Sequence, residues 1–249
     1  MWSPQDGPQV DAIDGRYAVD ELFYGGARGG GKSDFLLGDY LIDVEAYGID
    51  WKGILIRRTY PELEELITRG QEVFECGDLR QGAPCEWKVS AQTFQFANGA
   101  TLKLRHMDKD NDWTKYQGHQ YTWIGWDELP LFSTGGPYRR MKATLRSTKV
   151  PEKAMRIRST GNPGGPGMSW VKLFFQITGA TRKGYVALKS ESIAPGGRPS
   201  VRMYIPSKVQ DNQILLQNQP GYIQMLWDAC EGNDELFKAW LDGDWDVFF

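Results

Sequence analysis

The chain has 249 residues and a formal net charge of −3 at pH 7, so its charge gives no general reason to expect nucleic-acid binding. The length suits one large α/β domain, or a core with a small appendage. Cys76, Cys85 and Cys230 lack metal-ligand spacing, and two histidines are too few for a histidine-based zinc site or catalytic triad. No apolar run reaches membrane-spanning length and no secretory signal opens the chain, so we expect a soluble, cytoplasmic protein without a membrane partner.

Residues 2–9 are polar and rich in turn formers. A glutamine before a phosphate-binding loop can pair with the edge of adenine, because its amide offers both a donor and an acceptor. Gln9 is the candidate for this contact and Gln5 is the second choice. A solvated loop glutamine is an equally acceptable interpretation.

A short strand over residues 20–24 runs into a glycine-rich loop that ends at Gly31-Lys32-Ser33. Backbone N–H groups of such a loop turn towards phosphate oxygens, and side chains at several positions would obstruct that approach. Lys32 can reach the β and γ phosphates of a bound ATP, and the Ser33 hydroxyl can bind Mg²⁺. Apolar residues at helical spacing from Leu36 to Val44 predict a following helix that continues to Gly48. The alternative is a simple glycine-rich turn. The predicted phosphate-binding residues are Gly26, Ala27, Arg28, Gly29, Gly30, Gly31, Lys32 and Ser33.

Residues 53–58 form an apolar strand ending in Arg57 and Arg58, and a helix is predicted from Pro61. Strand, helix, strand and helix in succession predict a parallel sheet with crossover connections. The two arginines lie near the ligand-binding edge of such a sheet, where they can contact nucleotide or DNA or form structural ion pairs. Asn98-Gly99 predicts a two-residue hairpin turn between strands over residues 93–97 and 100–105.

A largely apolar strand over residues 121–126 delivers Asp127 and Glu128 at its end. Asp127 is the candidate to hold Mg²⁺ together with Ser33. Glu128 is the candidate general base that orients and deprotonates the water attacking the γ phosphate. Alone, this pattern is often a solvated strand end, but together with a phosphate-binding loop it predicts an ATP-hydrolysing site.

A helix is predicted over residues 138–146, after Gly135-Gly136-Pro137, and it opens an unusually basic segment. Its local excess of positive charge is a candidate DNA-contacting stripe, and one of its arginines can serve a neighbouring subunit's nucleotide; a solvated helix face is the alternative. The stripe comprises Arg139, Arg140, Lys142, Arg146, Lys149, Lys153, Arg156 and Arg158, of which the first four are the main DNA-binding candidates.

A strand over residues 155–159 leads into Thr160, Gly161 and Asn162, whose polar groups can sense the γ phosphate; a Gly/Pro turn is the alternative. A helix is predicted over residues 170–177, a linker over 194–199 and a strand over 201–205. Two further helices, one with an Asn233 cap and a Gly243 end, are interpreted as a lid or linker, or else as sheet-packing helices. We therefore expect an ATPase core over residues 1–206 and a helical lid or linker over 207–249.

As an ordered set, these motifs resemble those of the large terminase subunit of tailed bacteriophages, the ATPase that drives DNA into capsids. The resemblance covers nearly the whole chain. It rests on Gly7-Pro8-Gln9, Gly25 to Ser33, Arg57-Arg58-Thr59-Tyr60-Pro61, Tyr116-Gln117-Gly118, Ile124 to Glu128, Thr160 to Gly165 and Trp240 to Asp246.

The resemblance implies a P-loop NTPase of the additional-strand, catalytic-glutamate type, with a mostly parallel central sheet flanked by helices. It implies Mg²⁺-dependent ATP hydrolysis that moves double-stranded DNA into a procapsid. Arg28 would contact the γ phosphate as a catalytic residue with Lys32 and Glu128, and Thr160, Gly161 and Asn162 would couple ATP state to DNA movement. The expected partners are double-stranded DNA, a portal protein and a small terminase subunit. The expected form is a ring of five subunits in the host cytoplasm, with a monomer as the form in isolation.

The chain departs from the family pattern at two places. One is the position of an arginine finger, an arginine that reaches the nucleotide of a neighbouring subunit, and the other is the end of the chain. Some relatives carry an arginine that acts across subunits where this chain has Gln117. The family's C-terminal nuclease domain would begin where this sequence stops at Phe249, so we expect no DNA cleavage from this chain. The alternative functions are a helicase-like ATPase, a small-molecule kinase and a non-hydrolysing, nucleotide-gated assembly module.

Overall fold

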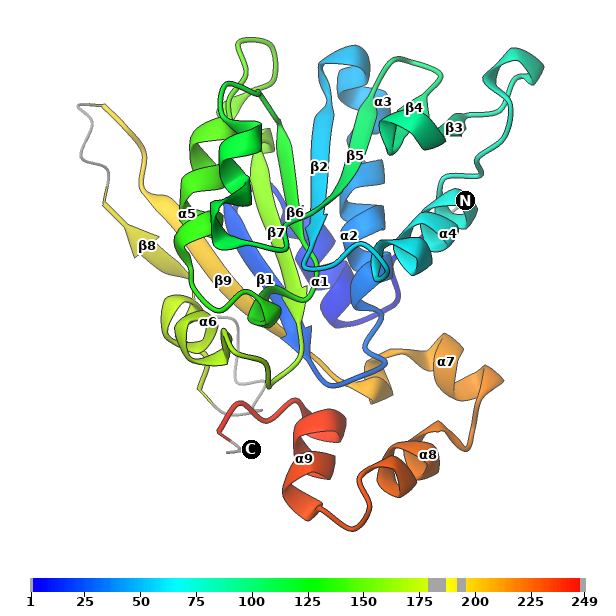
Figure 1. Ribbon diagram of the computed structural model, residues 1–249, viewed down its shortest axis with the longest axis vertical. Coiled ribbons are helices and arrows are strands. Elements are labelled where there is room, and N and C mark those ends of the chain that lie inside the picture. The colour runs from blue at the N-terminus through cyan, green and yellow to red at the C-terminus, as the bar shows by residue number, and fades with distance from the viewer. Residues whose placement is uncertain (1, 179–186, 192–195, 247–249) are drawn as a thin grey trace. The chain divides into compact units, whose positions relative to one another are not determined.

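The computed structural model describes residues 2–178, 187–191 and 196–246. In these ranges the strands are β1 (Glu21–Gly26), β2 (Lys52–Arg57), β3 (Cys85–Lys88), β4 (Thr93–Phe96), β5 (Thr101–His106), β6 (Trp123–Trp126), β7 (Arg156–Gly161), β8 (Leu188–Ser190) and β9 (Ser200–Ser207). They form one sheet in the hydrogen-bonded order β3-β4-β5-β2-β6-β7-β1-β9-β8 (Figure 1). Strand β2 runs parallel to β5 and β6, and β1 runs parallel to β9. Antiparallel pairing occurs between β3 and β4, β4 and β5, and β8 and β9.

The α-helices along the described chain are α1 (Pro8–Asp14), α2 (Lys32–Leu41), α3 (Val44–Tyr47), α4 (Leu63–Val73), α5 (Gly136–Met141), α6 (Met168–Phe175), α7 (Gln213–Asn218), α8 (Tyr222–Ala229) and α9 (Asp234–Asp242). Helices precede or follow most of the parallel strands, whereas β3, β4 and β5 succeed one another without an α-helix and α7, α8 and α9 are consecutive. The predicted α/β fold with a mostly parallel sheet is confirmed. Among the helices that the structure describes, none combines the length and the apolarity that a membrane crossing requires.

The density of contacts divides the chain into two compact units. Unit 1 comprises residues up to 4, residues 33–127 and residues 134–158. Unit 2 comprises residues 5–32, residues 128–133 and the described residues from 159 onwards. Each unit is described by itself. The expected boundary between residues 206 and 207 separates an ATPase core from a helical lid or linker. It does not coincide with a boundary of either unit and stays a prediction.

The core of unit 1 is built on β2, whose residues Gly53 to Ile56 are all buried. Aromatic rings fill the space beside it. Tyr40 stacks on Trp51 with ring centroids 5.9 Å apart and meets Trp123 edge to face at 5.5 Å. Such rings bury large apolar areas in favourable geometry, which fixes α2 against the strands of its own unit.

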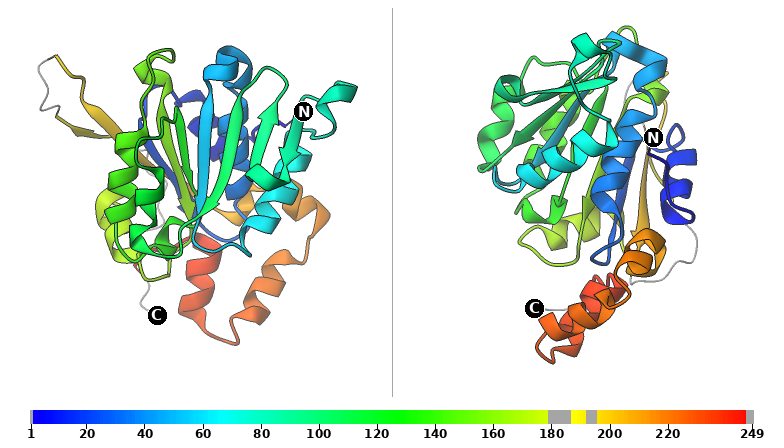
Figure 2. Two further views of the ribbon diagram at one scale, coloured as in Figure 1. Left: turned by 45° about the horizontal axis from the view of Figure 1, so that its top comes forward. Right: turned by 90° about the vertical axis from the view of Figure 1, so that its right-hand side faces the viewer.

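The core of unit 2 is built on β1, which is buried along its whole length. Phe23 contacts the rings of Phe175, Tyr204 and Trp245 at centroid distances of 5.2, 5.9 and 5.5 Å. Helices α8 and α9, coloured orange to red, lie side by side in both views of Figure 2. The Asn233 side chain caps α9 by accepting a bond from the Leu236 amide at 2.9 Å, as the sequence predicts.

Several element boundaries differ from the sequence-based expectations. The helix after the phosphate-binding loop ends at Leu41 and is followed by the separate short helix α3. The hairpin predicted at Asn98-Gly99 is present, but its turn has three residues: Phe96 N bonds to Ala100 O, and Gly99 takes the left-handed conformation at φ 91°. The helix expected over residues 138–146 ends at Met141 and continues only as a 3₁₀ turn. Helices α1 and α7 were not predicted, and the linker predicted over residues 194–199 lies partly outside the described residues.

Candidate nucleotide-binding site

Three successive carbonyl groups of the glycine-rich loop accept hydrogen bonds from side chains of unit 2. The Asn212 amide donates to Gly29 O at 2.8 Å, the Tyr24 hydroxyl donates to Gly30 O at 3.1 Å, and the Gln9 amide donates to Gly31 O at 2.9 Å. In a planar trans peptide the C=O and the following N–H point in opposite directions. The N–H groups of Gly30, Gly31 and Lys32 are therefore turned away from these partners, as a phosphate-binding loop requires.

The loop conformation depends on its glycines. Gly26, Gly29 and Gly31 have φ values of 133°, 73° and 70°, which side-chain-bearing residues rarely adopt. A Cβ added at Gly31 would lie 2.6 Å from the Gln9 amide nitrogen, and one added at Gly26 would lie 2.7 Å from Ser207 O. The spacing of glycines in the sequence is thus explained by backbone angles and by close packing behind the loop.

Lys32 occupies the first position of α2 and is largely buried, with 8% of its surface exposed. Its ammonium group donates to Ala27 O at 2.7 Å, which places the charge across the loop. The dipole of α2 adds positive potential at the same end of the helix. A phosphate group bound by the loop amides would lie within the field of both groups.

Gln9 and Gln5 support the loop from behind. Gln9 donates to Gly31 O, and its side-chain oxygen accepts a bond from the Gln5 amide at 2.9 Å. Gln5 donates from its own side chain to Asn212, the residue that holds Gly29 O. Both polar ends of the Gln9 amide are therefore engaged with the protein. Its predicted contact with adenine stays a prediction, and the contacts of the structure show it as a support of the loop.

Arg28 is exposed, and its guanidinium lies over the ring of Trp240 on α9, 3.8 Å from the ring centroid. The Arg28 amide also donates to Trp240 O at 2.8 Å. The C-terminal helices contact the loop at two more places, since a Cβ at Gly29 would meet Tyr222 at 2.8 Å and a Cβ at Gly243 would meet Gly26 at 2.5 Å. The catalytic role predicted for Arg28 is untested.

In unit 1, Ser33 and Arg57 line one cavity of about 440 Å³, which also contains Asp34 and Arg69. Arg57 Nε lies 3.4 Å from a carboxylate oxygen of the buried Asp127, and its Nη1 donates to Glu62 O at 2.6 Å. The ion-pairing interpretation of Arg57 is therefore the one that the structure shows.

The hydroxyl of Ser33 and the carboxylate of Asp127 are oxygen donors of the kind that Mg²⁺ prefers. Among the residues that the structure describes, no cluster of three or more His, Cys, Asp or Glu side chains could hold a metal ion.

Glu128 begins the part of unit 2 that follows β6 in the chain. It has φ 52° and ψ 50°, the left-handed region that few residues other than glycine adopt. The Asn162 side-chain amide donates to both of its carboxylate oxygens, at 3.2 and 3.3 Å. Gly161, next to Asn162, has no room for a side chain, because a Cβ would lie 2.3 Å from Pro130 Cδ. Unusual backbone angles of this kind are concentrated at functional sites.

The candidate DNA-binding residues lie on α5 and the turn after it. Arg139, Arg140 and Arg146 are exposed, and Lys142 is half-buried. Arg140 lies over the ring of Trp113 at 4.9 Å. The inclusion of Arg156 and Arg158 in the basic stripe is wrong, because both are fully buried and ion-paired. The remaining members can contact DNA only through the surface of α5 and its neighbouring turns.

The sheet, its crossover helices and the glycine-rich loop together define the α/β P-loop NTPase fold. Among solved structures, the chain is similar to the large terminase of the thermophilic bacteriophage D6E in complex with ADP, with a TM-score of 0.66 and 13% identity over 98% of this chain and 54% of that chain. It is similar to the large terminase ATPase domain of Thermus phage P74-26, with a TM-score of 0.62 and 15% identity over 98% of this chain and 94% of that chain. It is also similar to the large terminase of bacteriophage HK97, with a TM-score of 0.59 and 10% identity over 98% of this chain and 50% of that chain.

The chain therefore has the fold of a large-terminase ATPase domain, as the motif resemblance implies. It spans about half the length of the D6E and HK97 proteins. The sequence matches no family model and no curated protein.

Residues that support the loop were missed by sequence reasoning. Tyr24, Ser207, Asn212 and Trp240 contact the loop. Tyr24 and Trp240 lie in segments that the sequence singles out, but their contact with the loop was not predicted, and Ser207 and Asn212 belong to no recognised motif. The one available signal for Asn212 is its position before a helix, because its side chain also accepts from the Leu215 amide as an N-cap.

Proposed function

We propose that this chain is the motor domain of a large terminase subunit, which hydrolyses ATP with Mg²⁺ and uses the energy to move double-stranded DNA into a procapsid. The observation that carries the proposal is the loop whose carbonyls at Gly29, Gly30 and Gly31 each accept a bond from a side chain of unit 2, which turns the following N–H groups away from those partners. The fold agrees with it. The D6E terminase, which shares the fold, has been solved with ADP and with ATP-γ-S.

The binding roles follow from the chemistry of each group. The loop amides and Lys32 would hold the β and γ phosphates, and Ser33 and Asp127 would hold Mg²⁺. The bound Mg²⁺ would neutralise negative charge on the two phosphates. Lys32 would exchange its bond to Ala27 O for the phosphate oxygens, which are the stronger acceptors for an ammonium group.

Glu128 would accept a proton from the water that attacks the γ phosphate. The Asn162 amide contacts both oxygens of that carboxylate, so it would restrain the orientation of Glu128 towards the attacking water. In this proposal Thr160, Gly161 and Asn162 link the state of the nucleotide to the motion of DNA. Arg28 would leave the Trp240 ring to reach the γ phosphate.

The partners of the whole motor belong to the same proposal. Arg139, Arg140, Lys142 and Arg146 would contact the phosphates of double-stranded DNA. A portal protein, a small terminase subunit and a ring of five copies would complete the machine in the host cytoplasm. Because the chain corresponds to about half of the D6E protein, these properties concern an assembly larger than this domain.

Single-turnover hydrolysis of radiolabelled ATP tests the proposal, with and without double-stranded DNA. Wild type should release phosphate only with Mg²⁺, and DNA should accelerate the release. Glu128→Gln should keep ATP affinity and slow hydrolysis by on the order of a hundredfold or more. Glu64→Gln, an exposed carboxylate on α4, is the matched control and should hydrolyse like wild type. Lys32→Ala should abolish ATP binding.

The outcomes separate the alternative functions. Binding without hydrolysis in wild type would indicate a nucleotide-gated assembly module. Hydrolysis that DNA does not affect would favour a kinase-like enzyme. Unchanged affinity in Lys32→Ala, or wild-type turnover in Glu128→Gln, would refute the assignment of the site.

A further inference from the structure

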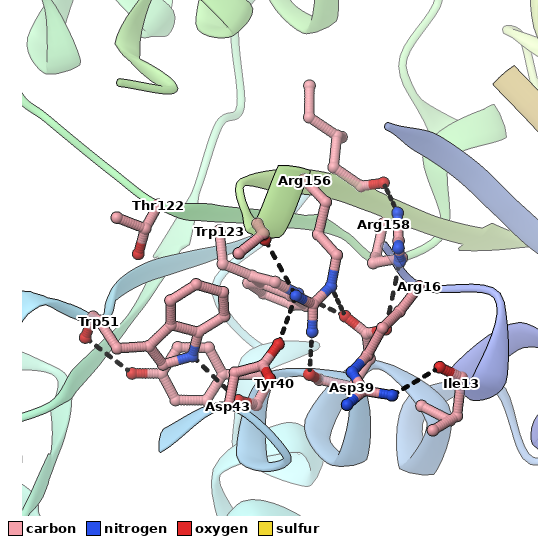
Figure 3. A network of polar contacts seen from close by, with 12 residues as sticks. Ile13, Arg16, Asp39, Tyr40, Asp43, Trp51, Thr122, Trp123, Arg156 and Arg158 are labelled. Atoms are coloured by element: carbon pink, nitrogen blue, oxygen red, sulfur yellow. Dashed lines mark hydrogen bonds and ion pairs between the residues drawn. The ribbon is translucent and has the colours of Figure 1, made fainter. Parts of the chain in front are cut away.

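Unit 1 contains a group of four fully or almost fully buried charged side chains that the proposed site does not use. Arg156 and Arg158 lie two residues apart on β7, so both point to the same face of the strand. Asp39 on α2 and Asp43 just beyond its end face them. Figure 3 shows both arginine side chains directed towards Asp39. The two positive and two negative charges balance.

Asp39 differs from Asp43 in the number of elements that it joins. One carboxylate oxygen of Asp39 accepts from Arg156 Nε at 2.8 Å and from Trp123 Nε1 at 2.7 Å, and the other accepts from Arg158 Nε at 3.2 Å. Trp123 opens β6. One side chain on α2 is therefore bonded to both β6 and β7 (Figure 3). Asp43 accepts a bond from Arg156 Nη1 at 2.5 Å, which joins it to β7.

The three joined elements lead to the proposed catalytic residues. Ser33 lies in the first turn of α2, Asp127 directly follows β6, and β7 continues into Thr160 and Gly161. Arg156 strengthens the junction by a further bond to the Asp39 backbone carbonyl at 2.7 Å, which fixes the helix itself as well as the side chain. Directional bonds of this kind add to the restraint that the packed rings place on rotation and sliding of the helix.

We infer that Asp39 is a positioning residue, which fixes the rotation of α2 on β6 and β7 and thereby sets where Ser33 stands with respect to Asp127. The inference rests on the proposed function. A stabilising role alone would not require this arrangement, because buried ion pairs can often be replaced by apolar side chains of similar size without loss of stability. Small displacements of catalytic groups, in contrast, reduce rates strongly.

Two charge-balanced double variants test the inference. Asp39→Leu/Arg158→Met and Asp43→Leu/Arg158→Met each remove one buried acid and the same arginine. They differ only in whether the carboxylate that joins α2 to β6 is kept. Both should bind ATP with an affinity close to that of wild type. The Asp39 pair should lose kcat by on the order of tenfold to a hundredfold, whereas the Asp43 pair should keep most of it.

A third variant, Trp123→Phe, serves if the Asp39 pair does not fold. It keeps every charge and removes the bond from β6 to Asp39 together with part of a buried ring. Its melting temperature should fall because of the cavity, while its ATP affinity stays near that of wild type and its kcat falls in the same direction as in the Asp39 pair. Equal kcat in the two double variants, or an unchanged kcat in a folded Trp123→Phe, would overturn the inference.

Amide hydrogen exchange provides a readout that does not depend on ATP hydrolysis. The amides of α2 should exchange faster in the Asp39 pair than in the Asp43 pair, while those of β2 should be equal in both. If wild type fails to hydrolyse ATP, the proposed function is refuted and the exchange experiment still decides whether Asp39 fixes α2. Equal exchange of α2 in both pairs would overturn the inference independently of the function.

Discussion

The side-chain amide of Asn162 donates to both carboxylate oxygens of Glu128, at 3.2 and 3.3 Å, and so joins the predicted coupling motif to the predicted general base. Glu128 itself has backbone angles in the left-handed region. A carboxylate held by a neutral donor is a weaker proton acceptor than one that is released. If Glu128 is the general base of the proposed function, this bond would act as a brake on hydrolysis.

Replacement of Asn162 by alanine tests this relationship. If the bond restrains Glu128, Asn162→Ala should raise basal ATP hydrolysis by on the order of tenfold to a hundredfold, because one charge-assisted hydrogen bond contributes about 1.5–3 kcal/mol and each 1.4 kcal/mol is a factor of ten. Stimulation by DNA should fall at the same time, because the link between the two motifs is lost. Steady-state phosphate release with and without DNA measures both effects. Asn218→Ala at the end of α7 is a control, and a basal rate below that of wild type in Asn162→Ala would contradict the brake.

A second prediction concerns the support of the phosphate-binding loop by Asn212. Asn212→Ala removes the donor to Gly29 O and leaves that carbonyl without its side-chain partner. We expect ATP affinity to fall about tenfold, which corresponds to the ~1.4 kcal/mol of one hydrogen bond. Because Asn212 also caps α7, Asn212→Ser is the matched variant: serine can cap the helix but is too short to reach Gly29. Titration calorimetry should therefore show equally weak binding in both variants, and normal affinity in Asn212→Ser would assign the effect to the cap alone.

A third prediction concerns DNA. Neutralising Arg139, Arg140 and Lys142 as glutamines should weaken association with double-stranded DNA. The slope of log K against log salt should become less negative by about 0.9 for each phosphate contact that is lost. Lys238→Gln, on the exposed side of α9, should leave both quantities unchanged. Fluorescence anisotropy at several salt concentrations makes the comparison, and an unaltered slope in the triple variant would show that α5 presents a solvated face.

A fourth prediction uses the charge state of Asp39. Burial alone would raise the pKa of the Asp39 carboxyl, but the charges of Arg156 and Arg158 and the bond from Trp123 outweigh burial and hold the pKa below its ordinary value. An acid whose pKa is lower in the folded state stabilises that state above its unfolded pKa of about 3.9, and the contribution disappears as the pH falls through the folded pKa. Urea unfolding should therefore show the free energy of unfolding falling as the pH drops below about 4.

Asp39→Asn is the test of that pH dependence. The variant should lose about 3–5 kcal/mol at neutral pH, because it leaves two buried arginines opposite one remaining aspartate. Its free energy of unfolding should fall less steeply than that of wild type below about pH 4. Asp14→Asn, at an exposed carboxylate on α1, should keep the wild-type steepness. An equally steep fall in Asp39→Asn would mean that Asp39 is not the titrating group.

The parts of the fold that could be predicted from the sequence are those that depend on residues close together in the chain. Gly31, Lys32 and Ser33 are recognisable because a bound phosphate requires those residue types at that spacing, and Asp127 and Glu128 are recognisable because they end an apolar strand. The strand, loop and helix around them were predicted for the same reason and are present as β1, the loop and α2. The catalytic roles of these residues stay predictions.

Other features depend on partners that are distant in the chain. Arg156 and Arg158 look like members of a basic surface segment, yet their acidic partner Asp39 is 117 and 119 residues away. Asn212 reaches Gly29 across 183 residues. Local periodicity contains no information about such pairs. Short helices such as α1 and α7 were missed because they are too brief to show an apolar repeat.

The contacts between the C-terminal helices and the phosphate-binding loop have a consequence for anyone who divides this protein into parts. A fragment ending at residue 206 would retain every recognisable nucleotide motif, but it would lack Asn212 behind Gly29, Tyr222 against the same glycine and Trp240 beneath Arg28. Such a fragment would contain the sequence motifs of an ATPase without the residues that support the conformation of its glycine-rich loop. We therefore expect the smallest nucleotide-binding unit of the proposed ATPase to extend through α9, because these helices contact the loop that would hold the phosphates.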